Sequence, residues 1–209
     1  AEDEAFTTGV QASGWQSSIS WNPAALSQSQ MYYWHVKARD IFGNEGAFSA
    51  PTWDFLVADD EPDASVTSAS QTSTDGSGVV TVTYNVSDPQ NDAVSLLVLF
   101  SVDGGSTWRQ AHIQSSSAGA VNNAGVNSGT STGQITGITT PRTGATLTWH
   151  TQNANNEGGA YLGESSNVYV KLTPNDGVNA GATRYSTFFT VDNVAPTGVG
   201  LQYPEINET

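Results

Sequence analysis

The sequence has no cysteine and few basic residues. Without cysteine there is no disulfide framework and no thiolate chemistry, so burial, backbone pairing and bound ions must hold the fold. Acidic residues number 20 against 6 basic ones, which gives a formal charge of −14. A surface of that sign repels phosphate backbones and anionic lipid headgroups, and it attracts divalent cations. The sequence therefore argues against nucleic acid and membrane surfaces as partners.

Long apolar runs are also missing. No stretch reaches the roughly 18 apolar residues that a membrane-spanning helix needs, so no direct membrane insertion is expected. Ala1 does not open a signal peptide, which predicts a mature or internal piece of an exported protein. Charged residues make up 12% of the chain, against about 25% in average soluble domains. This bias favours an extracellular or cell-surface location.

Alternation of apolar and polar residues with a period of two is the dominant pattern. It is clearest over residues 32–38 and 80–86, where every second side chain is apolar. Further strands are predicted at 52–57, 94–101, 107–113, 147–150, 167–173 and 185–192. Turn sequences such as Asp103-Gly104-Gly105 separate them. The chain is therefore predicted to be all-β and sandwich-like rather than α/β.

The alternation stops at several places, which predicts domain boundaries. Residues 59–63 form a short acidic linker, and residues 64–193 form a complete sandwich with a long insertion at about 115–142. Such an insertion is either a mobile loop or an ordered surface excursion. Residues 194–209 are a second linker that leads into a next domain or provides a strand to a neighbouring molecule.

Residues 26–51 carry a family resemblance. Leu26 lies six residues before Tyr32, and the run continues as Tyr33-Trp34-His35-Val36-Lys37-Ala38-Arg39-Asp40. This resembles the end of a fibronectin type III domain of a bacterial surface protein, with a tyrosine corner at Tyr32 and the last two strands. A whole sandwich of this kind needs seven strands in about 100 residues. The resemblance therefore implies that residues 1–58 are the C-terminal part of an incomplete sandwich, whose apolar face at Trp34 and Trp53 needs a cover.

The middle unit resembles the Ig-like modules that are repeated in very large bacterial exoproteins. The matching pieces are residues 82–88, 100–108, 147–149 and 189–193. Such modules act as spacers, adhesive stalks or assembly units. The resemblance implies tandem Ig-like and fibronectin type III-like β-sandwiches with a non-catalytic structural or adhesive role in a surface protein or filament. The expected partners are neighbouring domains of the same polypeptide or other copies in an assembly.

One short motif fits the Asp-box pattern of sialidase propellers, in which the Asp fixes a hairpin turn and the Trp packs beneath it. Its residues are Ser101, Asp103, Gly105 and Trp108. A propeller enzyme would show several copies at a regular spacing, whereas this sequence has one. We therefore predict a structural role for the motif and no enzymatic activity.

Carboxylate and amide oxygens gather at strand ends and in the linkers. The candidates are Asp59, Asp60, Asp63, Asp88, Asn91, Asp92 and Asp192. Calcium binds six to eight oxygen ligands of this kind in flexible loops, so these residues are candidate calcium ligands. The competing interpretation is that Asp and Asn start turns by bonding to their own backbone. The sequence leaves both interpretations open.

The six tryptophans favour an alternative function, an accessory carbohydrate-binding module of a secreted polysaccharide-degrading enzyme. Trp15 and Trp21 are the least constrained by strand pattern, although sandwich cores also use tryptophan.

The three histidines fall on different predicted strands without metal-ligand spacing, and each is interpreted as a surface residue. Asn85 and Asn207 head N-x-S/T sequons and are candidate glycosylation sites.

The strand at 94–101 is apolar on both faces. Because an open sandwich strand should be polar outside, Leu97 and Leu99 are expected to need a cover. We predict that the 115–142 insertion or a neighbouring molecule provides it.

Overall fold

A computed structural model describes residues 1, 4–72, 77–124 and 133–194. The chain divides into two compact units, which we call the first unit (Ala1–Asp60) and the second unit (from Glu61 onward). Over the described ranges there is no helix, and hence none able to cross a membrane. Every strand pair found there is antiparallel. The prediction of an all-β chain is confirmed.

The first unit contains a two-stranded antiparallel sheet, formed by β1 (Gln30–Trp34) and β2 (Trp53–Val57). Tyr32 is buried, and its hydroxyl accepts a hydrogen bond of 2.8 Å from the Ser27 N–H. This is the kind of bond that a tyrosine corner makes with the backbone a few residues upstream. The predicted strand over 32–38 ends early, at Trp34, because the residues that follow meet the 45–49 segment through scattered hydrogen bonds only.

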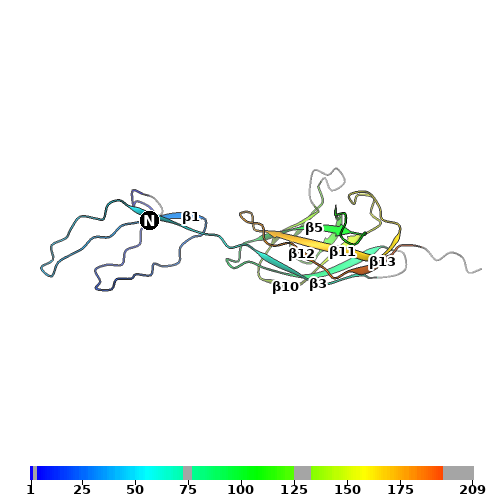
Figure 1. The fold of residues 1–209 in the computed structure, drawn as a ribbon, viewed down its shortest axis with the longest axis horizontal. Helices are drawn as coiled ribbons and strands as arrows, with labels where there is room; N and C mark the ends of the chain where they lie inside the picture. Colours follow the sequence, from blue (N-terminus) through cyan, green and yellow to red (C-terminus); the bar gives the residue numbers. More distant parts are fainter. Residues whose placement is uncertain (2–3, 73–76, 125–132, 195–209) are drawn as a thin grey trace, which may run out of the picture. The chain divides into compact units, whose positions relative to one another are not determined.

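The second unit is built from two antiparallel sheets (Figure 1). The first sheet has the order β3 (Asp63–Gln71), β4 (Val79–Ser87), β10 (Arg142–His150), β7 (Ile113–Ser116). The second has the order β12 (Arg184–Tyr185), β11 (Glu164–Asn175), β5 (Val94–Ser101), β9 (Gln134–Ile138), β8 (Ala120–Asn122). In addition, β13 (Phe189–Asp192) pairs with β11, and β6 (Arg109–Gln110) pairs with β5.

Alternate side chains of both sheets form one core, which makes the second unit sandwich-like. Val80, Val82 and Tyr84 of β4 are fully buried, as the period of two requires. Trp149 of β10 meets Phe100 of β5, with ring centroids 4.3 Å apart, and so joins the two sheets. Burying a side chain of this size contributes roughly 1.5–3 kcal/mol. Burial of this core therefore contributes strongly to the stability of the second unit.

The described parts of the 115–142 insertion contribute β8, β9 and the second half of β7. Strand β9 pairs with the first half of β5, and Gln134 lies opposite Leu97. Leu99 lies between Lys171 of β11 and Gln110 of β6, and both leucines are half-buried. Part of the insertion thus reaches β5 by strand pairing, and it lies beside the outer leucines rather than over them.

The predicted strand over 107–113 is in fact two strands. Its first part, β6, pairs with β5 in one sheet, whereas β7 begins at Ile113 and pairs with β10 in the other. The chain crosses between the sheets at Ala111 and His112. Alternation continues through this crossing, so the pattern alone does not reveal the break.

Candidate functional site

The Asp-box residues form a closed turn after β5. The Asp103 carboxylate accepts hydrogen bonds from the Thr107 Oγ1 (2.6 Å), the Ser101 Oγ (2.7 Å) and the Thr107 N–H (2.9 Å). The bonds from Thr107 and Ser101 lower the pKa of Asp103 to about 2. Gly105 adopts φ +88°, a conformation that favours glycine, and its N–H donates to Ser101 Oγ. Both oxygens of the Asp103 carboxylate therefore accept hydrogen bonds from within the turn.

Trp108 connects this turn to the outer face of the second sheet. A Cβ on Gly105 would contact the indole at 3.6 Å, so the turn rests against the Trp108 ring. The Lys171 Nζ lies 4.2 Å from the ring centroid, and the Tyr185 ring lies 5.7 Å from it. Neighbours from the turn, from β11 and from β12 therefore hold the indole in place, and Trp108 acts as part of the fold.

Asp88 closes the β4–β5 loop and is only 5% exposed. Its Oδ1 accepts hydrogen bonds of 2.9 Å from the N–H groups of Gln90 and Asp92. Asn91 has φ +66°, which Asn tolerates better than most residues. The Asp88 Oδ2 is buried and has no hydrogen-bond partner among the described residues. One oxygen of this carboxylate thus forms the turn, and the other remains unsatisfied inside the protein.

The other candidate calcium ligands have separate surroundings. Asp63 forms an exposed ion pair with Arg184 at 2.7 Å, and the Asp192 Oδ1 accepts a bond from the Val194 N–H. Asp59 and Asp60 belong to the first unit. Asp176, which sequence reasoning missed, closes a turn in the same way as Asp88 and also has a buried oxygen without a hydrogen-bond partner. In the part of the chain that is described, no three His, Asp or Glu side chains gather in a way that would hold a metal ion.

The sequon residue Asn85 lies on β4, between β3 and β10. It is half-buried, and its side chain bonds to the Ser65 Oγ (3.2 Å) and accepts a bond from the Gly144 N–H (2.9 Å). The amide that glycosylation would modify is therefore engaged on both sides. Asn207 lies outside the described residues, as does most of the 194–209 segment predicted to be a linker or donated strand.

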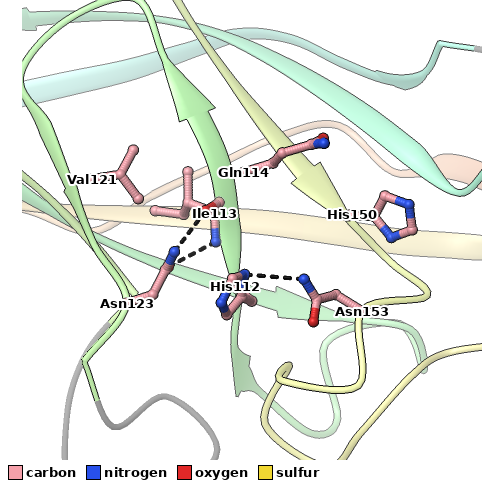
Figure 2. A pocket seen from close by; sticks show the side chains of 7 residues that line it. All are labelled: His112, Ile113, Gln114, Val121, Asn123, His150 and Asn153. Atoms are coloured by element: carbon pink, nitrogen blue, oxygen red, sulfur yellow. Dashed lines mark hydrogen bonds between the residues drawn. The ribbon is translucent and has the colours of Figure 1, made fainter.

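A pocket of about 350 Å³ lies beside the end of β10 (Figure 2). Its described lining consists of His112, Ile113, Gln114, Val121, Asn123, His150 and Asn153. Two of the three histidines of the chain therefore meet here. Trp149 pairs with Ile113 across β10 and β7, which brings the adjacent His150 and His112 to the same place. The alternation predicted that each histidine lies at the surface, but it did not predict that β7 and β10 pair.

Hydrogen bonds hold the walls of this pocket. The Asn123 side chain bonds to both the N–H (2.9 Å) and the carbonyl (2.7 Å) of Ile113. Asn153 Nδ2 lies 3.2 Å from His112 Nδ1. Figure 2 shows these contacts on the side of the pocket where β7 begins. The pocket is thus formed by side chains with defined positions.

Asn156 fixes the loop that follows β10 and was not identified from the sequence. It is fully buried, and its Oδ1 accepts bonds from the Trp149 Nε1 (3.0 Å) and the His112 N–H (2.8 Å). Its Nδ2 donates to the carbonyls of His150 (2.9 Å) and Thr151 (3.0 Å). One amide therefore ties the core tryptophan to both histidine-bearing segments.

Aromatic side chains of the first unit line one face of its two-stranded sheet. Trp34 and Trp53 stack at 4.8 Å, and Tyr32 and Phe55, two positions along the register and so on the same face, stack at 5.9 Å. Trp34, Trp53 and Phe55 are 44%, 41% and 44% exposed. We call Trp34, Trp53 and Phe55 the aromatic face.

The two tryptophans that the sequence left unassigned, Trp15 and Trp21, are also exposed. Arg39 and Lys37 lie 4.4 Å and 5.3 Å from the centroid of the Trp15 ring. Cations over an indole are attracted by its π-electrons, so Trp15 already has partners within its own unit.

The chain was compared with known proteins at three levels. No family model matches it, no curated protein is significantly similar in sequence, and no solved structure is significantly similar in fold.

Proposed function

We propose that this chain is a non-catalytic structural or adhesive module of an extracellular surface protein or filament. The observation that carries the proposal is the aromatic face of the first unit. Large apolar side chains arranged in register along two strands normally pack on a second sheet. A contiguous exposed apolar surface of this kind is typical of a site where another part of an assembly docks.

The fibronectin type III resemblance gives this face a specific meaning. In such a sandwich the last two strands turn their aromatic residues towards the opposite sheet, and Tyr32 makes the hydrogen bond expected of the tyrosine corner. We propose that the face is covered by strands from the same polypeptide or from another copy. The first unit then acts as one element of a series of tandem modules.

The chemistry of the second unit supports a structural role. Asp103, Asp88 and Asn156 use their oxygens to bind backbone and indole N–H groups of their own loops. Polar side chains arranged in this way stabilise loops between strands. They favour a durable module over a site that turns over a substrate.

Calcium is part of the proposal at one position. The buried Oδ2 of Asp88 lacks a hydrogen-bond partner, and an unpaired buried oxygen costs roughly 1–3 kcal/mol. A calcium ion held by this oxygen, with carbonyl, amide or water oxygens of the same loop, would offset that cost. The other acidic candidates contribute to the negative field that attracts the ion.

Surface labelling tests the proposed role. An antibody against the second unit, applied to intact cells that make the protein, is expected to decorate their surface or extracellular filaments. Labelling that requires permeabilised cells would overturn the proposal. Permeabilised cells and cells that lack the protein serve as the two controls.

The alternative is an accessory carbohydrate-binding module of a secreted polysaccharide-degrading enzyme. The exposed Trp34, Trp53 and Trp21 favour it, because indole rings stack on the apolar faces of sugars. A glycan array separates the two functions, since a structural module gives no reproducible glycan signal.

A further inference from the structure

The pocket around His112 and His150 has a polar lining without carboxylate, ammonium or guanidinium groups in its described walls. Its described walls contain no Asp, Glu, Lys or Arg, although the chain has 20 acidic residues. They carry instead two imidazoles, three amides and the exposed apolar side chain of Val121, whereas the Ile113 side chain is buried in the core. A lining of this kind suits a ligand without net charge that has both hydroxyl groups and apolar surface.

The hydrogen bonds already present show which polar groups are available to a ligand. The Asn155 N–H donates to the Asn153 Oδ1 at 2.9 Å, so the Asn153 Nδ2 must be the group that faces His112. The His112 Nδ1 then accepts this bond, and in the neutral ring the proton is on Nε2. His112 therefore has one N–H left to donate.

Two further groups at the wall have no partner within the described chain. Gln114 is exposed, and its amide can both donate and accept. The His150 Nδ1 is buried without a hydrogen-bond partner. Polar groups from β7, from His112 just before it, from β10 and from the loop after β10 thus line one pocket (Figure 2).

We propose that this pocket binds a single uncharged sugar residue, at the end or on a branch of a glycan. Its vicinal hydroxyls would bond to the Gln114 amide and the His112 Nε2–H, and its C–H groups would lie against Val121. The pocket volume of about 350 Å³ is at the small end of the range for ligand sites, which fits one ring rather than a long chain. The proposal rests on the carbohydrate-binding alternative, so its failure would leave the structural role standing, whereas glycan binding here would favour the alternative.

Saturation-transfer NMR on the 209-residue chain tests this assignment. The probes are the methyl glycosides of glucose, galactose, mannose and N-acetylglucosamine, each at about 10 mM to detect weak binding. At least one glycoside is expected to receive saturation and to shift the imidazole C–H signals of His112 and His150. Gln114→Ala, which removes an exposed side chain without internal bonds, is expected to weaken that binding about five- to tenfold.

His112→Ala should weaken binding by a similar factor, and His35→Ala is the matched control. His35 stacks between Phe6 and Phe48 in the first unit, so its removal should leave glycoside binding unchanged.

Absence of saturation transfer from every probe would overturn the pocket proposal and leave the structural role intact. Binding that survives both pocket variants but is lost in Trp34→Ser would also overturn it, while supporting the carbohydrate alternative at the aromatic face. Imidazole shifts on adding Zn²⁺, with none on adding glycosides, would point to a metal ligand and contradict the sugar assignment.

Discussion

At the scale of single residues, short polar side chains organise the loops of this protein. Asp40, Asp88 and Asp176 each accept two backbone N–H bonds from residues two to four positions ahead. Asp103 accepts one backbone N–H bond from Thr107 and two hydroxyl bonds, from Thr107 and Ser101. The hydrogen bonds from Asn44 lower the pKa of Asp40, as those from Thr107 and Ser101 lower that of Asp103. Turn formation therefore accounts for much of the acidic character at strand ends.

The Asp103 turn predicts an acid-sensitive contribution to stability. The folded pKa of about 2 lies below the ordinary value of 3.8, so folding favours the ionised form. The contribution is complete above about pH 4 and is lost as the pH falls through the folded pKa. An NMR titration of the Asp103 carboxyl should show the low pKa, and Thr107→Val should raise it. A wild-type pKa near 3.8 would contradict the hydrogen bonds described.

Asn156 is expected to be among the most sensitive polar residues. Asn156→Ala leaves the Trp149 Nε1 and the His112 N–H without partners in the interior, which should lower the free energy of unfolding by about 2–4 kcal/mol. Chemical denaturation followed by Trp fluorescence measures the change. The neighbouring exposed Asn155→Ala should cost less than about 1 kcal/mol. Equal effects of the two variants would show that the Asn156 bonds contribute little.

At the scale of strands, the strength of packing differs between the core and the first-unit sheet. Leu147 of β10 is fully buried, whereas Leu56 of β2 is largely exposed. Leu147→Ala should therefore destabilise the second unit by about 2–5 kcal/mol, and Leu56→Ala should change stability by less than about 0.5 kcal/mol. Urea unfolding of the two variants makes the comparison. A large loss in the Leu56 variant would mean that β2 is covered in solution.

The strands that alternation predicted best are those in the sandwich core. The range 94–101 coincides with β5, and 80–86 lies within β4, because one face of each strand is buried and the period of two is enforced there. Strand β3, with its polar Ser and Thr residues, was not predicted, nor were β8 and β9 within the insertion. These strands form through pairing with neighbours distant in sequence, which a local pattern does not encode.

The candidate site was less predictable than the fold. The Asp103 turn is local in sequence, so its residues could be named in advance. The pocket depends on the register that places His150 beside His112, 38 residues earlier in the chain (150 − 112 = 38), and on the Asn123 and Asn153 side chains that hold its walls. A single sequence shows that these residues are polar and outward-facing, but not that they meet.

At the scale of the whole molecule, each unit has its own internal contacts. The apolar core that joins two sheets is formed by residues of the second unit, from Ala64 to Val191. We therefore expect removal of residues 1–60 to change the thermal midpoint of the second unit by only a few degrees. Calorimetry of the shortened and full chains measures it. Failure of residues 61–209 to fold would show that the first unit is required.

Calcium is expected to stabilise the second unit through Asp88. A ligand that binds the folded state alone raises stability by about 2.7 kcal/mol at 100 times its dissociation constant. Thermal unfolding after exhaustive chelation, followed by calcium titration, should show a rising midpoint that Asp88→Asn reduces. Asp63→Asn, which removes an exposed ion pair, is the matched control and should keep the calcium response. An unchanged midpoint in the wild-type chain would exclude the site.

The pairing of β3 with β13 through Gln71 has a mechanical consequence. The Gln71 side chain bonds to both the N–H and the carbonyl of Asp192, so the last residue of β3 meets the last residue of β13. The chain consequently enters the sandwich at the start of β3 and leaves it at the opposite end. A pulling force on these two points acts along the strands, so the hydrogen bonds of β3 with β4 and of β13 with β11 bear the load together in shear. A module loaded in this direction resists tension far better than one whose edge strands are peeled away bond by bond.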